Sequence, residues 1–156
     1  MTRMIRSLLL VACSTFATHA IAQDAPPDER GMEKVKRFME ICASTPDLEE
    51  AGKLLIAEKV VHASKRDKNN PAKLNSDSIR FAFKKAHGNI GMYQPTLVRT
   101  VLTGTTAVGF GRTGQKGKLY KYFIAKKDGV NGMPAPVQIF YPENGEDPVV
   151  YDFGSF

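Results

Sequence analysis

The sequence is poor in cysteine and lacks the short motifs that accompany most catalytic and metal sites. Its two cysteines, Cys13 and Cys42, form no Cys-x-x-Cys pair, so the signatures of redox exchange and covalent haem attachment are missing. His-Glu-x-x-His, His-x-x-x-His and Gly-x-Ser-x-Gly, which mark zinc and serine hydrolases, are missing too. The sequence therefore predicts no cofactor and no metal site, and it identifies no catalytic or ligand-binding residue.

Long apolar runs are scarce as well, and the one at the N-terminus has the features of a secretory leader. Arg3 and Arg6 precede an apolar core, and Ala20–Ala22 supplies the small-x-small pattern that signal peptidase recognises. Residues 1–22 are therefore predicted to be a signal peptide. No other stretch approaches the roughly 18 apolar residues that cross a bilayer. We expect a periplasmic or secreted protein without a transmembrane segment.

A second interpretation of the leader depends on Cys13. The run Leu10-Val11-Ala12-Cys13 resembles the lipobox of bacterial lipoproteins, and acylation of this cysteine would anchor the protein to a membrane. However, only six residues separate Arg6 from Cys13, which is shorter than the roughly 7–15 residues of an apolar h-region. Cleavage after Ala22 is the favoured interpretation, and lipid attachment is the alternative.

The charge of the chain is mildly positive. The full sequence has 22 Lys and Arg against 16 Asp and Glu; loss of residues 1–22 removes two arginines and no acid, which leaves +4. Such a charge favours an acidic protein surface or an anionic envelope component as partner, although a solvated lysine-rich surface is the simpler explanation. Nucleic acid is not expected as a partner in this compartment.

Helical periodicity occupies the first half of the predicted mature chain. Residues 23–31 are polar with two prolines and are expected to be a flexible terminus, so that one domain spans residues 32–156. Helices are predicted over about 32–43, 46–62 and 76–88, with Thr45 as a cap of the second and Gly88 as the C-terminal cap of the third. Val35, Phe38, Met39 and Cys42 share one face of the first helix, which predicts a buried, structural cysteine.

After residue 89 the pattern changes to that of antiparallel strands. Thr and Val become frequent, and turns with glycine recur at short intervals. Together with the helices this predicts an α+β domain, with about three helices on one face of a curved sheet of four or five strands. The strands are expected at Thr96–Leu102, Thr106–Arg112, Lys118–Lys126, Val137–Tyr141 and Val149–Phe153. Their inward side chains are expected to be Val98, Thr100, Leu102, Val108, Phe110, Tyr120, Tyr122, Ile124, Val137, Ile139, Tyr141, Val149, Tyr151 and Phe153.

This order of elements carries a resemblance. Helices followed by Gly104–Phe110, then Gly117–Ile124, then two short strands resemble the cystatin-like superfamily, which includes nuclear transport factor 2 and ketosteroid isomerase. The likeness covers most of the mature chain as a pattern, without an identity motif. The isomerase branch implies a carboxylate, with a tyrosine or second acid, between helices and sheet. The strand pattern places no acid there, since Asp152 is predicted to face outward.

Two groups of polar residues are candidates for recognition. Basic residues gather around the hairpin of the third predicted strand and could form a patch for an anionic partner; lysines that protect strand edges from aggregation are the competing explanation. His62 and His87 each lie near a predicted helix end, where the helix dipole favours a cationic imidazole. The candidate patch consists of Arg112, Lys116, Lys118 and Lys121, near Lys126 and Lys127.

Two functions fit these observations. The first is an exported, non-enzymatic binding or protein-interaction module of the bacterial envelope, with a role in assembly, secretion or inhibition. The alternative is a small-ligand pocket protein or isomerase-like enzyme. A solvent-connected cavity between helices and sheet would favour the second, and filling of that space would argue against it. The filling residues would be Phe83, Phe110, Tyr122 and Ile139. A homodimer is compatible with either function.

Overall fold

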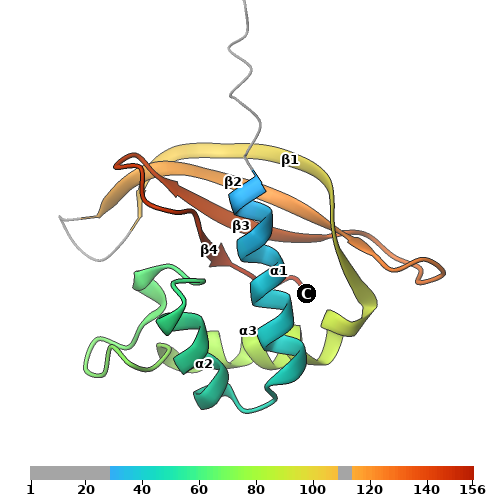
Figure 1. Ribbon diagram of the computed structural model, residues 1–156, viewed down its shortest axis with the longest axis horizontal. Coiled ribbons are helices and arrows are strands. Elements are labelled where there is room, and N and C mark those ends of the chain that lie inside the picture. The colour runs from blue at the N-terminus through green and yellow to red at the C-terminus, as the bar shows by residue number, and fades with distance from the viewer. Residues whose placement is uncertain (1–28, 109–113) are drawn as a thin grey trace, which may run out of the picture.

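A computed structural model describes residues 29–108 and 114–156, and the predicted leader lies outside these ranges. In them, three α-helices precede a four-stranded antiparallel sheet of order β1-β2-β3-β4 (Figure 1), so the predicted α+β class is confirmed. The elements are α1 (Glu29–Ser44), α2 (Leu48–Ala57), η1 (Ala63–Lys65), α3 (Ser76–Asn89), η2 (Ile90–Met92), β1 (Tyr93–Val108), β2 (Gln115–Lys126), β3 (Ala135–Pro142) and β4 (Val149–Asp152).

Helix α1 packs across the sheet, in contact with both β1 and β4 (Figure 1). It begins at Glu29, three residues before the predicted start. The predicted apolar stripe is buried, including Val35, Phe38 and Cys42. Burial raises the pKa of the Cys42 thiol to about 12, so the thiol stays protonated and the prediction of a buried, structural cysteine is confirmed.

Helix α2 is shorter than predicted at both ends. Its N-cap is Asp47, whose carboxylate accepts the Glu50 N–H at 2.9 Å, so the prediction that Thr45 caps this helix is wrong. The helix ends at Ala57 because Lys59 adopts a left-handed backbone, with φ 51°. Beyond it the chain extends, and Val61 forms a parallel bridge with Val150 of β4. The predicted helix to residue 62 is therefore replaced by a short extension of the sheet.

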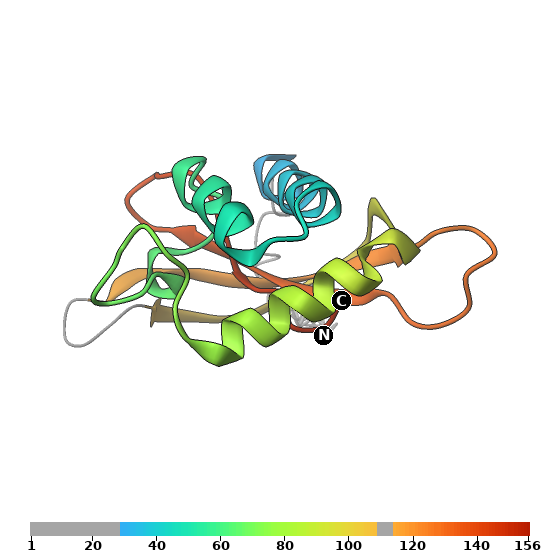
Figure 2. The same cartoon turned by 90° about the horizontal axis from the view of Figure 1, so that it is seen from below.

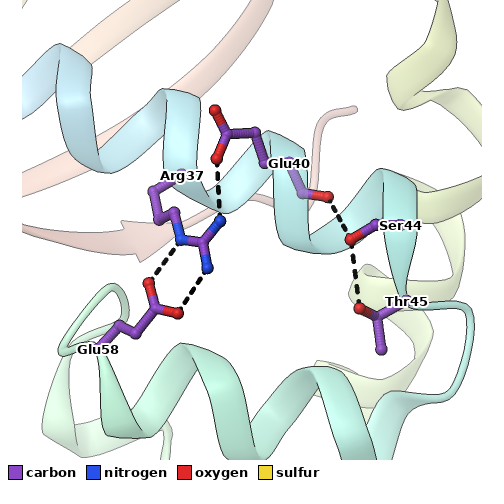
Figure 3. A network of polar contacts seen from close by, with 5 residues as sticks. All are labelled: Arg37, Glu40, Ser44, Thr45 and Glu58. Carbon is purple, nitrogen blue, oxygen red and sulfur yellow. Dashed lines mark hydrogen bonds and ion pairs between the residues drawn. The ribbon is translucent and has the colours of Figure 1, made fainter.

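An arginine joins α1 to the end of α2 (Figure 3). Arg37 donates from Nε and from its second terminal nitrogen to the two carboxylate oxygens of Glu58, at 2.5 and 2.6 Å. Its remaining nitrogen contacts Glu40 at 3.0 Å. Hydrogen bonding to Arg37 lowers the pKa of Glu58. A bidentate pair of this kind defines orientation as well as distance, so Glu58 and the turn after it are held against α1.

Helix α3 begins at Ser76, as predicted, but it continues through Gly88 to Asn89. Gly88 is therefore a helical residue and does not act as the C-terminal cap. His87, in the last turn, contacts the backbone carbonyl of Cys42 through Nδ1 at 2.5 Å. Because a carbonyl only accepts, Nδ1 carries the proton and donates, which links α3 to the end of α1.

The sheet differs from the prediction in its first strand. β1 is continuous from Tyr93 to Val108, so the predicted turn at residues 103–105 is absent, and two predicted strands are one. Instead of a turn, the strand has a β-bulge here, and its register against β2 shifts between Leu102 and Gly104. Another shift between Leu97 and Arg99 leaves Val98 55% exposed, contrary to the predicted inward position.

Most other inward predictions are confirmed. Tyr120, Tyr122, Ile124, Val137 and Ile139 are buried. In β4 the inward side chain is Val150, which pairs with Ile139 and faces the helices. Val149 and Tyr151, which were predicted to face inward, are half-buried instead. A register shift in β3–β4 causes this change of face. Val108 and Phe110 cannot be compared: side-chain burial is not described for the first, and the second lies outside the described residues.

Helices α1 and α2 cover one face of the sheet, whereas α3 does not lie on that face (Figure 2). Figure 2 shows α1 and α2 on the same side of the strands, and Figure 1 shows α3 beyond β4. The end of the chain returns to the core, where the rings of Phe153 and Phe156 lie 4.6 and 6.1 Å from that of Phe38. None of the helices in residues 29–108 and 114–156 has the length and hydropathy of a membrane span.

Candidate functional site: a pocket beside β4 and an open sheet face

The space between the helices and the sheet is filled with side chains. Phe83, Tyr122 and Ile139, three of the four residues predicted to fill it, are at most 1% exposed. The hydroxyl groups of Tyr122 and Tyr141 meet at 2.6 Å beneath α1. Among the residues whose burial is described, the buried polar ones are Thr45 and His62, and neither is a carboxylate. Among these residues, no buried Asp or Glu corresponds to the acid that the isomerase branch has between helices and sheet.

A pocket of about 330 Å³ lies instead at the outer side of β4. One wall is the extended chain that follows α2, and the other is the connection between β3 and β4. The residues that line it and carry polar groups are Lys59, His62, Arg66, Gln115, Glu146 and Asp147.

His62 is the buried polar residue of this pocket, with 5% of its surface exposed. Its ring lies edge-on to Phe140 and Tyr151, at centroid distances of 5.2 and 5.6 Å. Nδ1 accepts the Ser64 N–H at 3.1 Å, which places the proton of the neutral ring on Nε2. Nε2 is buried and has no partner at full hydrogen-bond geometry within the described structure, although the Gln115 side chain interacts with the ring. A desolvated N–H donor without an acceptor is costly.

The environment of His62 favours the neutral ring. Burial is the largest cause that lowers its pKa, and the Lys65 ammonium adds to it, whereas the Gln115 side chain acts in the opposite direction. The sequence placed His62 at a helix end as a cation stabilised by the dipole. That interpretation is wrong, because α2 ends at Ala57 and His62 lies in the extended segment.

Charged groups face this pocket from both walls. Arg66 also has a buried Nε without an acceptor, and neither Arg66 nor Lys59 forms an ion pair with another described residue. Across the pocket, Glu146 accepts from the Gln115 amide at 2.8 Å, and Asp147 lies 3.7 Å from Arg30 of α1. Opposite charges thus line one cavity without neutralising each other.

The predicted basic patch is divided between two faces. Lys116, Lys118 and Tyr120 are two residues apart in β2 and therefore share the helix side of this strand, where both lysines are exposed. Lys121 lies on the opposite face. Arg112 lies outside the described residues. The described lysines of the patch therefore do not converge on one surface.

The face of the sheet opposite α1 is the second candidate surface. Arg99 pairs with Phe123, its guanidinium 4.0 Å from the ring centroid, and Val101 pairs with Lys121. Val101 is 44% exposed, and Phe123 and Lys121 are half-buried. These four residues form one contiguous surface, which we call the outer patch. The sequence did not reveal it, because it depends on the register of β1 against β2.

Within the described residues, no group of three or more His, Cys, Asp or Glu side chains is arranged to hold a metal ion. Comparison of the chain with known families, curated proteins and solved structures finds no match.

Proposed function

We propose that this protein is an exported, non-enzymatic binding module of the bacterial envelope, which recognises an acidic polypeptide through the outer patch and the free edge of β1. Export rests on the leader pattern of residues 1–22. We also propose that α1 and the curved sheet correspond to the cystatin-like arrangement, on the basis of the order of the elements. The observation that carries the functional proposal is the composition of the outer patch.

Charge is the first argument. β1 and β2 contain no Asp or Glu, and on the outer patch Arg99 and Lys121 are the charged residues. Complementary charge increases the rate of encounter and selects among partners. An acidic partner fits this face, whereas a basic one would be repelled.

The chemistry of the remaining groups favours a polypeptide. An arginine stacked on an aromatic ring, next to an exposed valine, is the type of cluster that dominates protein interfaces. β1 is also the first strand of the sheet and pairs only with β2 in the described structure, so its other edge has free backbone groups. An extended polypeptide can satisfy such groups by adding a strand.

A photo-crosslinking residue at position 101 tests this proposal. Placed there in the protein expressed in its native cells, it is expected to form a discrete adduct with another protein, and raised ionic strength is expected to reduce the yield. The control is the same residue at Lys36, which is exposed on α1. Equal adducts from both positions, adducts with lipid alone, or a self-adduct alone would contradict the proposal.

Charge reversal separates this surface from the general charge of the protein. Arg99→Glu with Lys121→Glu is expected to abolish the adduct from position 101. Lys34→Glu with Lys36→Glu changes the net charge equally on α1 and is expected to preserve it. Equal loss in both double variants would mean that net charge, rather than the outer patch, determines binding.

A further inference from the structure

The pocket beside β4 is separate from the outer patch, and its polar groups have no role in the function proposed above. It contains two features that a merely structural cleft does not require: buried donors without acceptors of good geometry, and opposite charges on facing walls that do not pair with each other. Each restricts the chemistry of a molecule that could occupy it.

The unpartnered donors define one end of the occupant. His62 Nε2–H and Arg66 Nε–H are both buried N–H groups without an acceptor at full hydrogen-bond geometry. The Gln115 side chain of the same pocket interacts with the His62 ring without meeting that geometry. Lys59 adds an ammonium group to the same wall. Two unsatisfied donors with two cations call for an acceptor that carries negative charge, and a carboxylate provides two oxygens for this purpose.

The opposite wall defines the other end. Glu146 and Asp147 are exposed carboxylates on the connection between β3 and β4. Each has one neutral or distant partner, the Gln115 amide at 2.8 Å and Arg30 at 3.7 Å, so both retain free acceptor oxygens. An ammonium group complements this wall. A purely anionic ligand would be repelled by it.

The size of the pocket limits what lies between the two ends. Its volume of about 330 Å³ is at the lower end of the roughly 300–1,000 Å³ of ligand pockets. The occupant therefore has its positive and negative groups separated by a few bonds.

We propose that this pocket binds a small zwitterion of the α-amino acid class, with its carboxylate towards His62, Arg66 and Lys59 and its ammonium group towards Glu146 and Asp147. The backbone at the pocket supports a functional role. Lys59 has a left-handed conformation at a position that ordinarily favours glycine. Strain of this kind persists where the side chain itself is needed.

The test is a titration of the protein with each proteinogenic L-amino acid, followed by NMR of the His62 ring nitrogens. At least one amino acid is expected to shift the Nε2 signal saturably. Its N-acetyl and carboxamide derivatives, which lack one charge each, are expected to bind at least about tenfold more weakly. Absence of a saturable shift with every amino acid would overturn the proposal, and so would equal binding of a singly charged derivative.

Matched variants locate the binding in the pocket. Glu146→Gln keeps the shape of the side chain and is expected to weaken binding about tenfold. Glu143→Gln, on the same connection but outside the pocket, is expected to have no effect. Equal effects of the two variants would contradict the assignment. The adduct from position 101 is expected to be unchanged in Glu146→Gln, so this inference and the proposed function fail or succeed independently.

Discussion

The hydroxyl groups of Tyr122 and Tyr141 lie 2.6 Å apart, directly under the first turn of α1. Gly31 occupies that turn, and a β-carbon on this residue would overlap both hydroxyls. The absence of a side chain therefore allows α1 to approach the sheet, and a polar contact is enclosed where the helix crosses β2 and β3.

Gly31→Ala is expected to destabilise the fold by about 1–3 kcal/mol, because overpacking forces either the helix or the tyrosines to move. Gly88→Ala is the matched control, since a β-carbon there meets nothing within 4 Å. It is expected to be neutral or to stabilise by up to about 1 kcal/mol through helix propensity. Urea unfolding of both variants measures the difference, and equal effects would contradict the close approach.

Lys59→Gly is expected to raise the stability by about 1 kcal/mol, because glycine adopts the left-handed backbone without a steric penalty. Lys53→Gly, in the middle of α2, is expected to lower it by about the same amount. Thermal and urea unfolding measure these opposite signs. If Lys59→Gly also weakens the binding of an amino acid, stability and function oppose each other at this position. If Lys59→Gly lowered the free energy of unfolding, the backbone at Lys59 would not be strained.

The stability is expected to fall as the pH decreases below about 7. The folded state lowers the pKa of His62 from its ordinary value of 6.5, so the unfolded chain binds a proton first. This contribution is complete above pH 6.5 and is lost as the pH falls through that value towards the folded pKa. Burial is the main cause of the lowered pKa; the Lys65 ammonium adds to it, and the Gln115 side chain opposes it. Lys59, Arg66, Glu146 and Asp147 are the other charged groups that line the same pocket.

His62→Asn is the control for this pH dependence. Asparagine does not titrate and keeps an acceptor for the Ser64 N–H. Unfolding free energies of both proteins between pH 8 and pH 5 are expected to show a steeper loss for the parent. Parallel curves would show that His62 is not responsible.

Phe156→Ala is expected to destabilise the fold by about 3–5 kcal/mol, since this ring is 2% exposed and packs against Phe38 and Tyr93. Phe81→Ala removes the same atoms from a side chain that is 72% exposed, and is expected to change stability by no more than about 0.5 kcal/mol. Chemical denaturation measures the free energy of unfolding of both variants. A similar loss of stability in the two would mean that Phe156 does not belong to the core.

The order of elements and most of the core could be predicted from periodicity alone. The stripe of α1 and the alternation of β2 each repeat over several residues, so an error at one position does not change which face is buried. The errors occur where one local signal was decisive. Gly104 suggested a turn, but the tertiary structure uses it as a bulge. Val61 fitted a helical period, but its pairing with β4 extends it.

The candidate site was less accessible to sequence reasoning. The pocket combines the segment after α2 with a connection some eighty residues later, and no motif relates Arg66 to Glu146. The outer patch similarly requires the register that places Arg99 opposite Phe123. One signal was available: His62 follows two β-branched residues, which is unusual at a helix end and typical of a strand.

Helix α1 is attached to both sides of the pocket. Arg37 holds Glu58, the neighbour of Lys59, and Arg30 contacts Asp147 on the facing connection. Seven residues separate the two arginines, which corresponds to about 10 Å of a rigid helix. These two contacts fix the spacing of the cationic and anionic walls in the folded chain. If the pocket binds an amino acid as proposed, we expect this spacing to select it by the distance between its own charges.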